Sequence, residues 1–211
     1  MKVFFFFFSL FFFSSAYAQE KDCVGFSLTG AQTQVIFVNG INNLRNKAKC
    51  SADTLARLLI SEEFPHGSFD YSYYYNKTEG FFHDYGELGA QALLSSQAVR
   101  SPAINTTDER YNYYYTLGKI YYDSFANNLH LEGDKAAVFY PAYGLWEGLK
   151  QRIKEGKKIV LVAHSQGNFF VEAAYAVLVY EEALLFQKGV YTDSIRVVGV
   201  APVSSTSPSS S

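Results

Sequence analysis

The chain lacks a large excess of charge of either sign, and it carries no cluster of metal-ligating residues. Its 211 residues include 18 basic and 20 acidic side chains, for a net charge of −2. Without a basic field, nucleic acid is not an expected partner. No set of His, Asp and Glu residues has the spacing of metal ligands, and Gly-rich phosphate loops are absent, so we expect neither a metal nor another cofactor.

A long apolar run is also missing, because the one near the N-terminus is too short to span a membrane. It extends from Val3 to Phe13, whereas a transmembrane helix needs about 20 residues. Lys2 precedes the run, and a small-residue cleavage site ends at Ala18. These features predict a secretory signal peptide over residues 1–18, with a transmembrane anchor as the alternative, and an exported protein that is periplasmic or secreted.

Cysteine is scarce, with Cys23 and Cys50 as the only two copies. In an exported protein the oxidising compartment favours a disulfide between them, which would tie the start of the mature chain to the first helix. Two buried thiols are the alternative.

Continuous apolar segments predict buried parallel strands over Gln34–Val38, Ile159–Ala163 and Ile195–Val203, and a less regular pattern predicts a fourth over Phe69–Tyr75. Helical patterns separate these strands, beginning with one from about Leu44 to Ile60. This alternation predicts an α/β fold, a mostly parallel sheet flanked by helices, over residues 19–211.

The segment from about residue 80 to 156 is predicted to be a mostly helical, Tyr-rich insertion in this fold. One helix there carries aromatic side chains at three- and four-residue steps, and a second runs from about Tyr143 to Glu155 and ends before Gly156. The aromatic series comprises Tyr111, Tyr114, Tyr115, Tyr121, Tyr122 and Phe125, and Gly118 lies on the same helix face. Plain core packing is the favoured interpretation, and a lid over an apolar pocket is the alternative.

The strand Ile159–Ala163 runs through His164 and Ser165 into a strongly apolar helix. A serine at a tight strand-to-helix turn is presented as a nucleophile beside backbone N–H groups. We therefore predict Ser165 as the nucleophile and the N–H of Gln166 as an oxyanion donor, with Gly167 supplying backbone freedom. His164 is expected to pack beside the sheet. An incidental serine at such a junction is the competing interpretation.

A second strand-to-helix turn follows Val38 and supplies the other half of the predicted oxyanion hole. Gly40 permits close approach of the backbone, the N–H of Ile41 is the candidate donor, and Asn39 would brace the loop through side-chain bonds to the backbone. A turn with good capping residues and no catalytic role is the alternative.

Together, segments 37–43 (FVNGINN) and 163–168 (AHSQGN) resemble the α/β-hydrolase superfamily, closest to bacterial lipase- or esterase-like members of unassigned substrate. The resemblance covers most of residues 19–211. It implies a triad in the chain order Ser, Asp or Glu, then His, at the carboxyl ends of parallel strands. It also implies that the Gln34 strand lies beside the Ile159 strand, which would bring Ile41 and Ser165 together.

The triad acid and base are not recognisable in this chain. No histidine follows Ser165, and His66, His83 and His130 precede it. The acids after the serine are Glu172, Glu181 and Glu182 on the helix and Asp193 at the amino end of its strand. We therefore expect a truncated sequence whose C-terminal strands, acid and His are missing. A natural protein without triad chemistry is the alternative.

These features predict an exported serine hydrolase that cleaves carboxylic esters, with a small-molecule or lipid ester as substrate and no transmembrane segment after signal cleavage. The alternatives are a non-catalytic binding protein on a hydrolase fold, and a thioesterase or peptidase that uses the same site.

Overall fold

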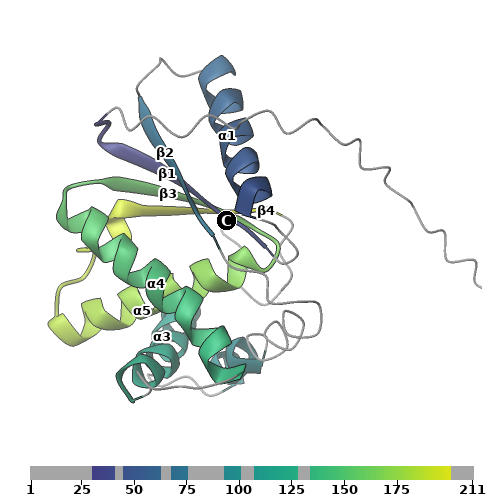
Figure 1. The fold of residues 1–211 in the computed structure, drawn as a ribbon. Coiled ribbons are helices and arrows are strands. Elements are labelled where there is room, and N and C mark those ends of the chain that lie inside the picture. The colour runs from purple at the N-terminus through teal and green to yellow at the C-terminus, as the bar shows by residue number, and fades with distance from the viewer. Residues whose placement is uncertain are drawn as a thin grey trace, which may run out of the picture.

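The computed structural model describes residues 30–40, 45–62, 68–75, 93–100, 107–127 and 134–200. Its centre is a sheet of four parallel strands, as predicted, and their order is β2-β1-β3-β4 (Figure 1). The strands are β1 (Thr33–Val38), β2 (Phe69–Tyr74), β3 (Lys158–His164) and β4 (Ile195–Val200).

Helices separate the strands along the chain, which is the alternation expected of an α/β fold. They are α1 (Arg45–Glu62), a short helix over residues 93–100, α3 (Glu109–Asn127), α4 (Asp134–Lys154) and α5 (Gly167–Leu185). A turn of 3-10 helix, Thr192–Ser194, leads into β4. In the described part of the chain, no helix combines the length and apolar character needed to cross a bilayer.

Helices cover both faces of the sheet. Successive side chains of a strand point to opposite faces, so each strand contributes to the packing on both sides. Val35 and Val162 pack with Ala56 of α1 on one face. Ile36 and Leu161 face the opposite side, where α4 and α5 lie (Figure 1). This double coverage explains why β1 and β3 are continuous apolar runs.

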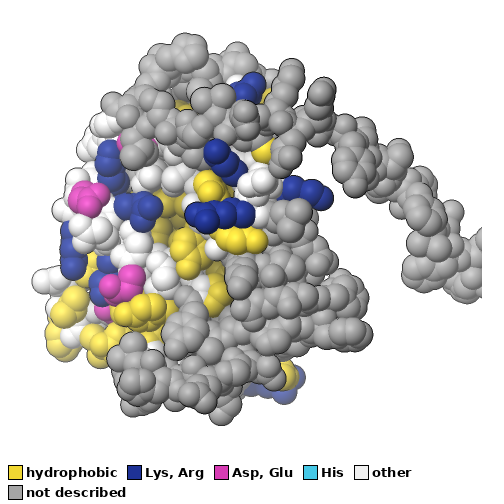
Figure 2. All heavy atoms as spheres, viewed as in Figure 1, with side chains coloured by type: hydrophobic (Ala, Val, Ile, Leu, Met, Phe, Trp, Pro, Cys, Tyr) yellow, Lys and Arg dark blue, Asp and Glu magenta, His cyan; other side chains and the backbone are white. Residues whose placement is uncertain are grey.

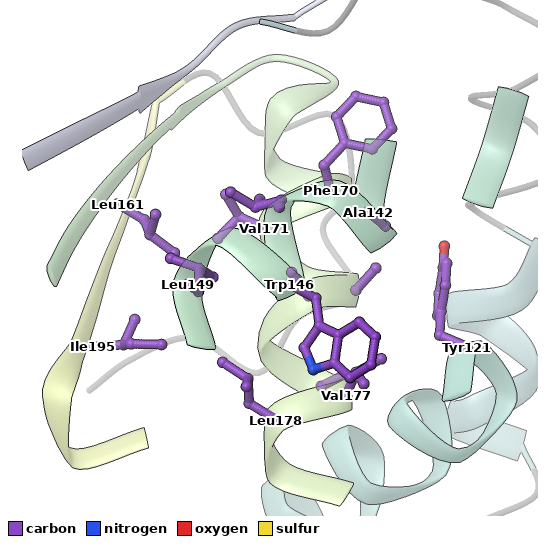
Figure 3. Packing of buried hydrophobic residues seen from close by; sticks show 14 of the residues in the cluster. Tyr121, Ala142, Trp146, Leu149, Leu161, Phe170, Val171, Val177, Leu178 and Ile195 are labelled. Carbon is purple, nitrogen blue, oxygen red and sulfur yellow. The ribbon is translucent and has the colours of Figure 1, made fainter. Parts of the chain in front are cut away.

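The larger core lies between the sheet, α4 and α5, and α3 packs on the far side of α5. Figure 3 shows Leu161 of β3 and Trp146 of α4 beside α5, with Tyr121 projecting from α3. Tyr121 and Phe125 are buried, so these members of the aromatic series are core residues. Helix α3 therefore belongs to the same core as the sheet.

Helix α4 begins earlier than predicted, at Asp134 instead of about Tyr143, and it contains Pro141. A proline inside a helix removes one backbone hydrogen bond. The Tyr74 hydroxyl donates to the Pro141 carbonyl at 2.7 Å and thereby ties this turn to the end of β2. Burial raises the pKa of Tyr74 to about 12, so the hydroxyl keeps the proton that it donates. The predicted C-terminal end of this helix, before Gly156, is confirmed. Gly156 has a φ of +81°, and its N–H donates to the Ile153 carbonyl.

Glu182 fixes the connection from α5 to β4. Its buried carboxylate accepts hydrogen bonds from the N–H groups of Gly189, Tyr191 and Thr192 at 3.0, 2.6 and 2.7 Å, and from the Thr192 hydroxyl at 3.0 Å. Ile195, the first residue of β4, follows this loop and is buried. Glu182 therefore holds a loop at the amino end of the sheet.

The expectation that the last strand is buried was wrong for most of β4. Val197, Val198 and Val200 are 47%, 48% and 43% exposed, because β4 is an edge strand that, among the described strands, pairs only with β3. Further exposed apolar side chains, including Phe186, gather at the C-terminal end of α5 (lower left in Figure 2). The apolar run that predicted β4 did not distinguish an edge strand from an interior strand.

Helices α3 and α5 approach closely at Gly118. A Cβ atom on this glycine would lie 2.0 Å from the carbonyl oxygen of Ala176. We predict that Gly118→Ala lowers the free energy of unfolding by about 2 kcal/mol or more, because the helices must separate to admit the methyl group. Urea denaturation followed by circular dichroism measures the change.

The matched control is Gly148→Ala in α4, where the new methyl would meet only the guanidinium end of the Arg152 side chain, at 3.0 Å. This variant should be neutral or slightly stabilising, since Ala exceeds Gly in helix propensity by up to about 1 kcal/mol. Equal effects of the two substitutions would contradict the close helix contact.

Candidate active site

The candidate site lies where the chain leaves the sheet in two directions. From β1 the chain passes through α1 to β2 on one side, and from β3 it passes through α5 to β4 on the other. Helices α1 and α5 cover opposite faces of the sheet (Figure 1). At such a switch point the loops after the two central strands diverge and leave a crevice at their carboxyl ends, which is where open α/β sheets bind ligands.

Ser165 occupies the turn between β3 and α5 and has a left-handed backbone, with a φ of +54°. This conformation is unfavourable by roughly 1–2 kcal/mol for a residue with a side chain. Surrounding contacts must therefore hold it, and strain of this kind is concentrated at functional sites. The Ser165 side chain lies at the carboxyl edge of the sheet and is half-buried.

The loop after β1 packs directly against Ser165. A Cβ atom placed on Gly40 would lie 2.6 Å from the Ser165 Cβ and 3.1 Å from its Oγ. A Cβ on Gly167 would lie 2.4 Å from the Val38 carbonyl oxygen. Both positions therefore need glycine for close approach of two backbones. The two loops that the sequence predicted to form one site thus meet through Gly40 and Ser165.

Asn39 braces the loop as expected. Its side chain is fully buried, and its Nδ2 donates to the Gly40 carbonyl oxygen at 2.8 Å. This hydrogen bond holds the Gly40 carbonyl in one orientation. The proposed donor Ile41 itself lies outside the described residues.

Gln166 is the N-cap residue of α5, with φ −57° and ψ −25°, and it is fully buried. Its carbonyl accepts from the Phe169 N–H at 2.9 Å, in the first turn of the helix. The first turn of a helix carries the positive end of its dipole. This end of α5 therefore places a positive potential beside Ser165.

Asn168 is the residue whose role the sequence analysis missed. Its Nδ2 donates to the Ser165 carbonyl oxygen at 2.7 Å and to the Val200 carbonyl oxygen at 3.3 Å. The signal was available: a short amide side chain two or three residues from a strained turn often bonds to the local backbone.

Glu172 projects from α5 toward α3. It accepts from the Tyr113 hydroxyl at 2.8 Å and from the Ser95 hydroxyl at 3.4 Å. Burial, reinforced by the Glu172 charge, raises the pKa of Tyr113, which keeps the phenol protonated as a donor. These bonds join α5 to α3 and to the helix over residues 93–100.

Asp193 lies before β4, at the amino end of the sheet. A strand of this length extends about 20 Å, so Asp193 is distant from Ser165 and is not its acid partner. His164, the last residue of β3, is the only histidine among the described residues. The other predicted positions that lie outside them are Cys23, His66, His83 and His130.

Cys50 on α1 is disulfide-bonded. The expected partner, Cys23, lies outside the described residues, so the pairing stays a prediction. Among the residues that the structure describes, no three His, Cys, Asp or Glu side chains are grouped so as to hold a metal ion. Comparisons with protein families, with curated proteins and with solved structures find no match.

We predict that Ser165→Gly is more stable than Ser165→Ala by about 1 kcal/mol. Both changes remove the hydroxyl, but only glycine adopts positive φ without strain. Chemical denaturation of the two variants gives the difference in the free energy of unfolding.

The same pair of substitutions at Phe186 serves as a control, because Phe186 also has a φ of +54° but lies at the far end of α5. Phe186→Gly should likewise be more stable than Phe186→Ala. A Ser165→Ala variant as stable as Ser165→Gly would show that the turn is not held in the left-handed conformation.

Proposed function

We propose that this protein is a serine hydrolase that cleaves carboxylic esters, with Ser165 as the nucleophile. The observation that carries the proposal is the contact between two loops: Ser165, held at positive φ between β3 and α5, lies against Gly40 after β1. A strained serine at a strand-to-helix turn, facing a second loop, is the arrangement that acyl transfer requires.

In the proposed reaction the Ser165 Oγ attacks the ester carbonyl carbon and gives up its proton to a base. The carbonyl oxygen takes the negative charge. When the tetrahedral intermediate collapses, the bond to the alcohol oxygen breaks, and the alcohol leaves with a proton. Water then attacks the acyl-serine, releases the carboxylic acid and restores the hydroxyl.

The proposed oxyanion donors are the backbone N–H groups of Gln166 and Ile41. Gln166 is suited to this role because it is the N-cap of α5, whose dipole favours negative charge at that end. Asn39 would support the second donor, since its side chain bonds to the carbonyl of Gly40, the residue before Ile41. Preorganised donors of this kind supply much of the rate enhancement in acyl transfer.

Two further features favour a relationship to the α/β-hydrolase superfamily. The site lies at a topological switch point of a parallel sheet, and a buried helix follows the serine. Small residues flank the turn, with Ala163 fully buried and Gly167 against the Val38 carbonyl. The relationship is our proposal, drawn from this geometry and from segments 37–43 and 163–168.

His164 is not our candidate for the base. It ends an extended strand, where consecutive side chains point to opposite faces, and Ser165 follows it directly. The proposal therefore rests on the nucleophile and the oxyanion donors.

We predict that a fluorophosphonate labels the native, full-length protein at Ser165. The serine Oγ would displace fluoride from phosphorus, in the same geometry as its attack on an ester. Mass spectrometry of the digested adduct identifies the modified residue. Ser165→Ala should abolish labelling and lower the hydrolysis of a p-nitrophenyl ester by at least about a hundredfold.

Ser194→Ala is the matched control, because Ser194 is also half-buried but lies at the amino end of the sheet. It should label normally. Labelling at any other serine, or none in a folded protein, contradicts the proposal, and the second outcome favours a binding protein on this scaffold. Thioester or amide substrates preferred over oxygen esters would reassign the substrate class to thioesterase or peptidase.

We further propose that the protein is exported, with residues 1–18 as its signal peptide. The disulfide at Cys50 favours an oxidising compartment. N-terminal sequencing of the protein from its native host should begin at Gln19, after cleavage behind Ala18. An N-terminus at Met1 or Lys2 would contradict the proposal.

A further inference from the structure

Both backbone groups of Ser165 are hydrogen-bonded. The N–H bonds to the end of β4, and the carbonyl bonds to Asn168. The Ser165 N–H donates to the Val200 carbonyl oxygen at 3.1 Å. The Ser165 carbonyl accepts from the Asn168 N–H at 3.1 Å and from the Asn168 Nδ2 at 2.7 Å. The same Nδ2 reaches the Val200 carbonyl at 3.3 Å. One amide group therefore bridges the turn and the strand.

This bonding differs from helix capping. A capping side chain accepts hydrogen bonds from the free N–H groups of the first turn, whereas the Asn168 amide donates to carbonyl oxygens. Asn168 is the second residue of α5, so its side chain is directed back at the turn before the helix. The bonds stabilise the turn at Ser165 more than the helix itself.

Gly199 provides the space that this arrangement needs. A Cβ atom on Gly199 would lie 2.8 Å from the Asn168 Oδ1. Gly199 is an exposed residue in an edge strand, where a β-branched residue is usually favoured. The close approach of Asn168 gives a physical reason for glycine at this position.

We propose that Asn168 is the positioning residue for the nucleophile, holding Ser165 in its left-handed conformation and joining it to the carboxyl end of β4. The catalytic part of this inference rests on the proposed hydrolase function. The geometric part does not, because it concerns only the conformation of the turn. Asn168 acts through Ser165 and touches no reacting atom.

The first test compares fluorophosphonate labelling rates of wild type and Asn168→Ala. Loss of the bridging amide should slow labelling of Ser165 about tenfold, the effect of a hydrogen bond worth roughly 1.4 kcal/mol. Ser124→Ala is the control, since it removes a side-chain bond of 2.8 Å to a backbone carbonyl on α3. The control should label at the wild-type rate, and an equal rate for Asn168→Ala overturns the proposal.

The isosteric variant Asn168→Asp separates positioning from packing. Ionised Asp has no proton to donate and repels the two carbonyl oxygens, whereas protonated Asp has one. The labelling rate of Asn168→Asp relative to wild type should therefore rise as pH falls below about 5, toward the ordinary carboxyl pKa. The Asn168→Ala ratio should stay flat. A flat ratio for Asn168→Asp as well, over the range in which circular dichroism shows it folded, overturns the proposal.

A double-mutant cycle tests the role of Gly199. Gly199→Ala should slow labelling several-fold by displacing the Asn168 side chain. In the Asn168→Ala background the same change should have little further effect, because the clashing oxygen is gone. Additive effects of the two substitutions would show that Gly199 and Asn168 act independently.

If the wild type does not react with the fluorophosphonate, the proposed function is refuted but the positioning role is not. Native-state hydrogen exchange then tests that role directly. The Ser165 amide should exchange at least tenfold faster in Asn168→Ala than in wild type, while amides of α3 remain unchanged. Unchanged protection of Ser165 overturns the positioning role whatever the labelling shows.

Discussion

The left-handed backbone of Ser165 and the close approach of the loop after β1 depend on each other. Positive φ turns the chain sharply from β3 into α5, and this turn brings Gly167 against the Val38 carbonyl and Ser165 against Gly40. A side chain at either glycine would push the strand and the helix apart. The unfavourable conformation persists because the buried helix, the sheet and three hydrogen bonds to the backbone of Ser165 hold it.

The rest of the fold supplies a rigid frame for this turn. Phe170, Val177 and Leu178 of α5 are fully buried against the sheet and the neighbouring helices (Figure 3). Gly118 lets α3 pack closely on the other side, and Glu182 fixes the loop that leads into β4. As a result, the end of β4 returns to the site at a fixed position and its last carbonyl binds the Ser165 N–H. A catalytic group held within a rigid scaffold loses little freedom when it reacts.

Periodicity and turn chemistry predicted much of this arrangement. The four parallel strands and the apolar helix after the serine followed from apolar runs ending in Asn, Gly or Ser. The meeting of the Gly40 and Ser165 loops was expected only from the resemblance to the α/β-hydrolase superfamily. The exposure of β4 did not follow, because a run of valines has the same pattern at an edge as inside a sheet. The role of Asn168 was also missed. Its bond to the Ser165 carbonyl is local, but its bond to the Val200 carbonyl joins residues 32 positions apart and has no local signature.

A crystal structure of the protein after reaction with a phosphonate ester tests the central claim most directly. The account predicts phosphorus bonded to the Ser165 Oγ, with Ser165 still at positive φ. It also predicts a phosphonyl oxygen about 2.7–3.1 Å from the Gln166 nitrogen, the distance of an oxyanion-hole hydrogen bond. A phosphonyl oxygen directed away from α5, or an adduct on another residue, would contradict it.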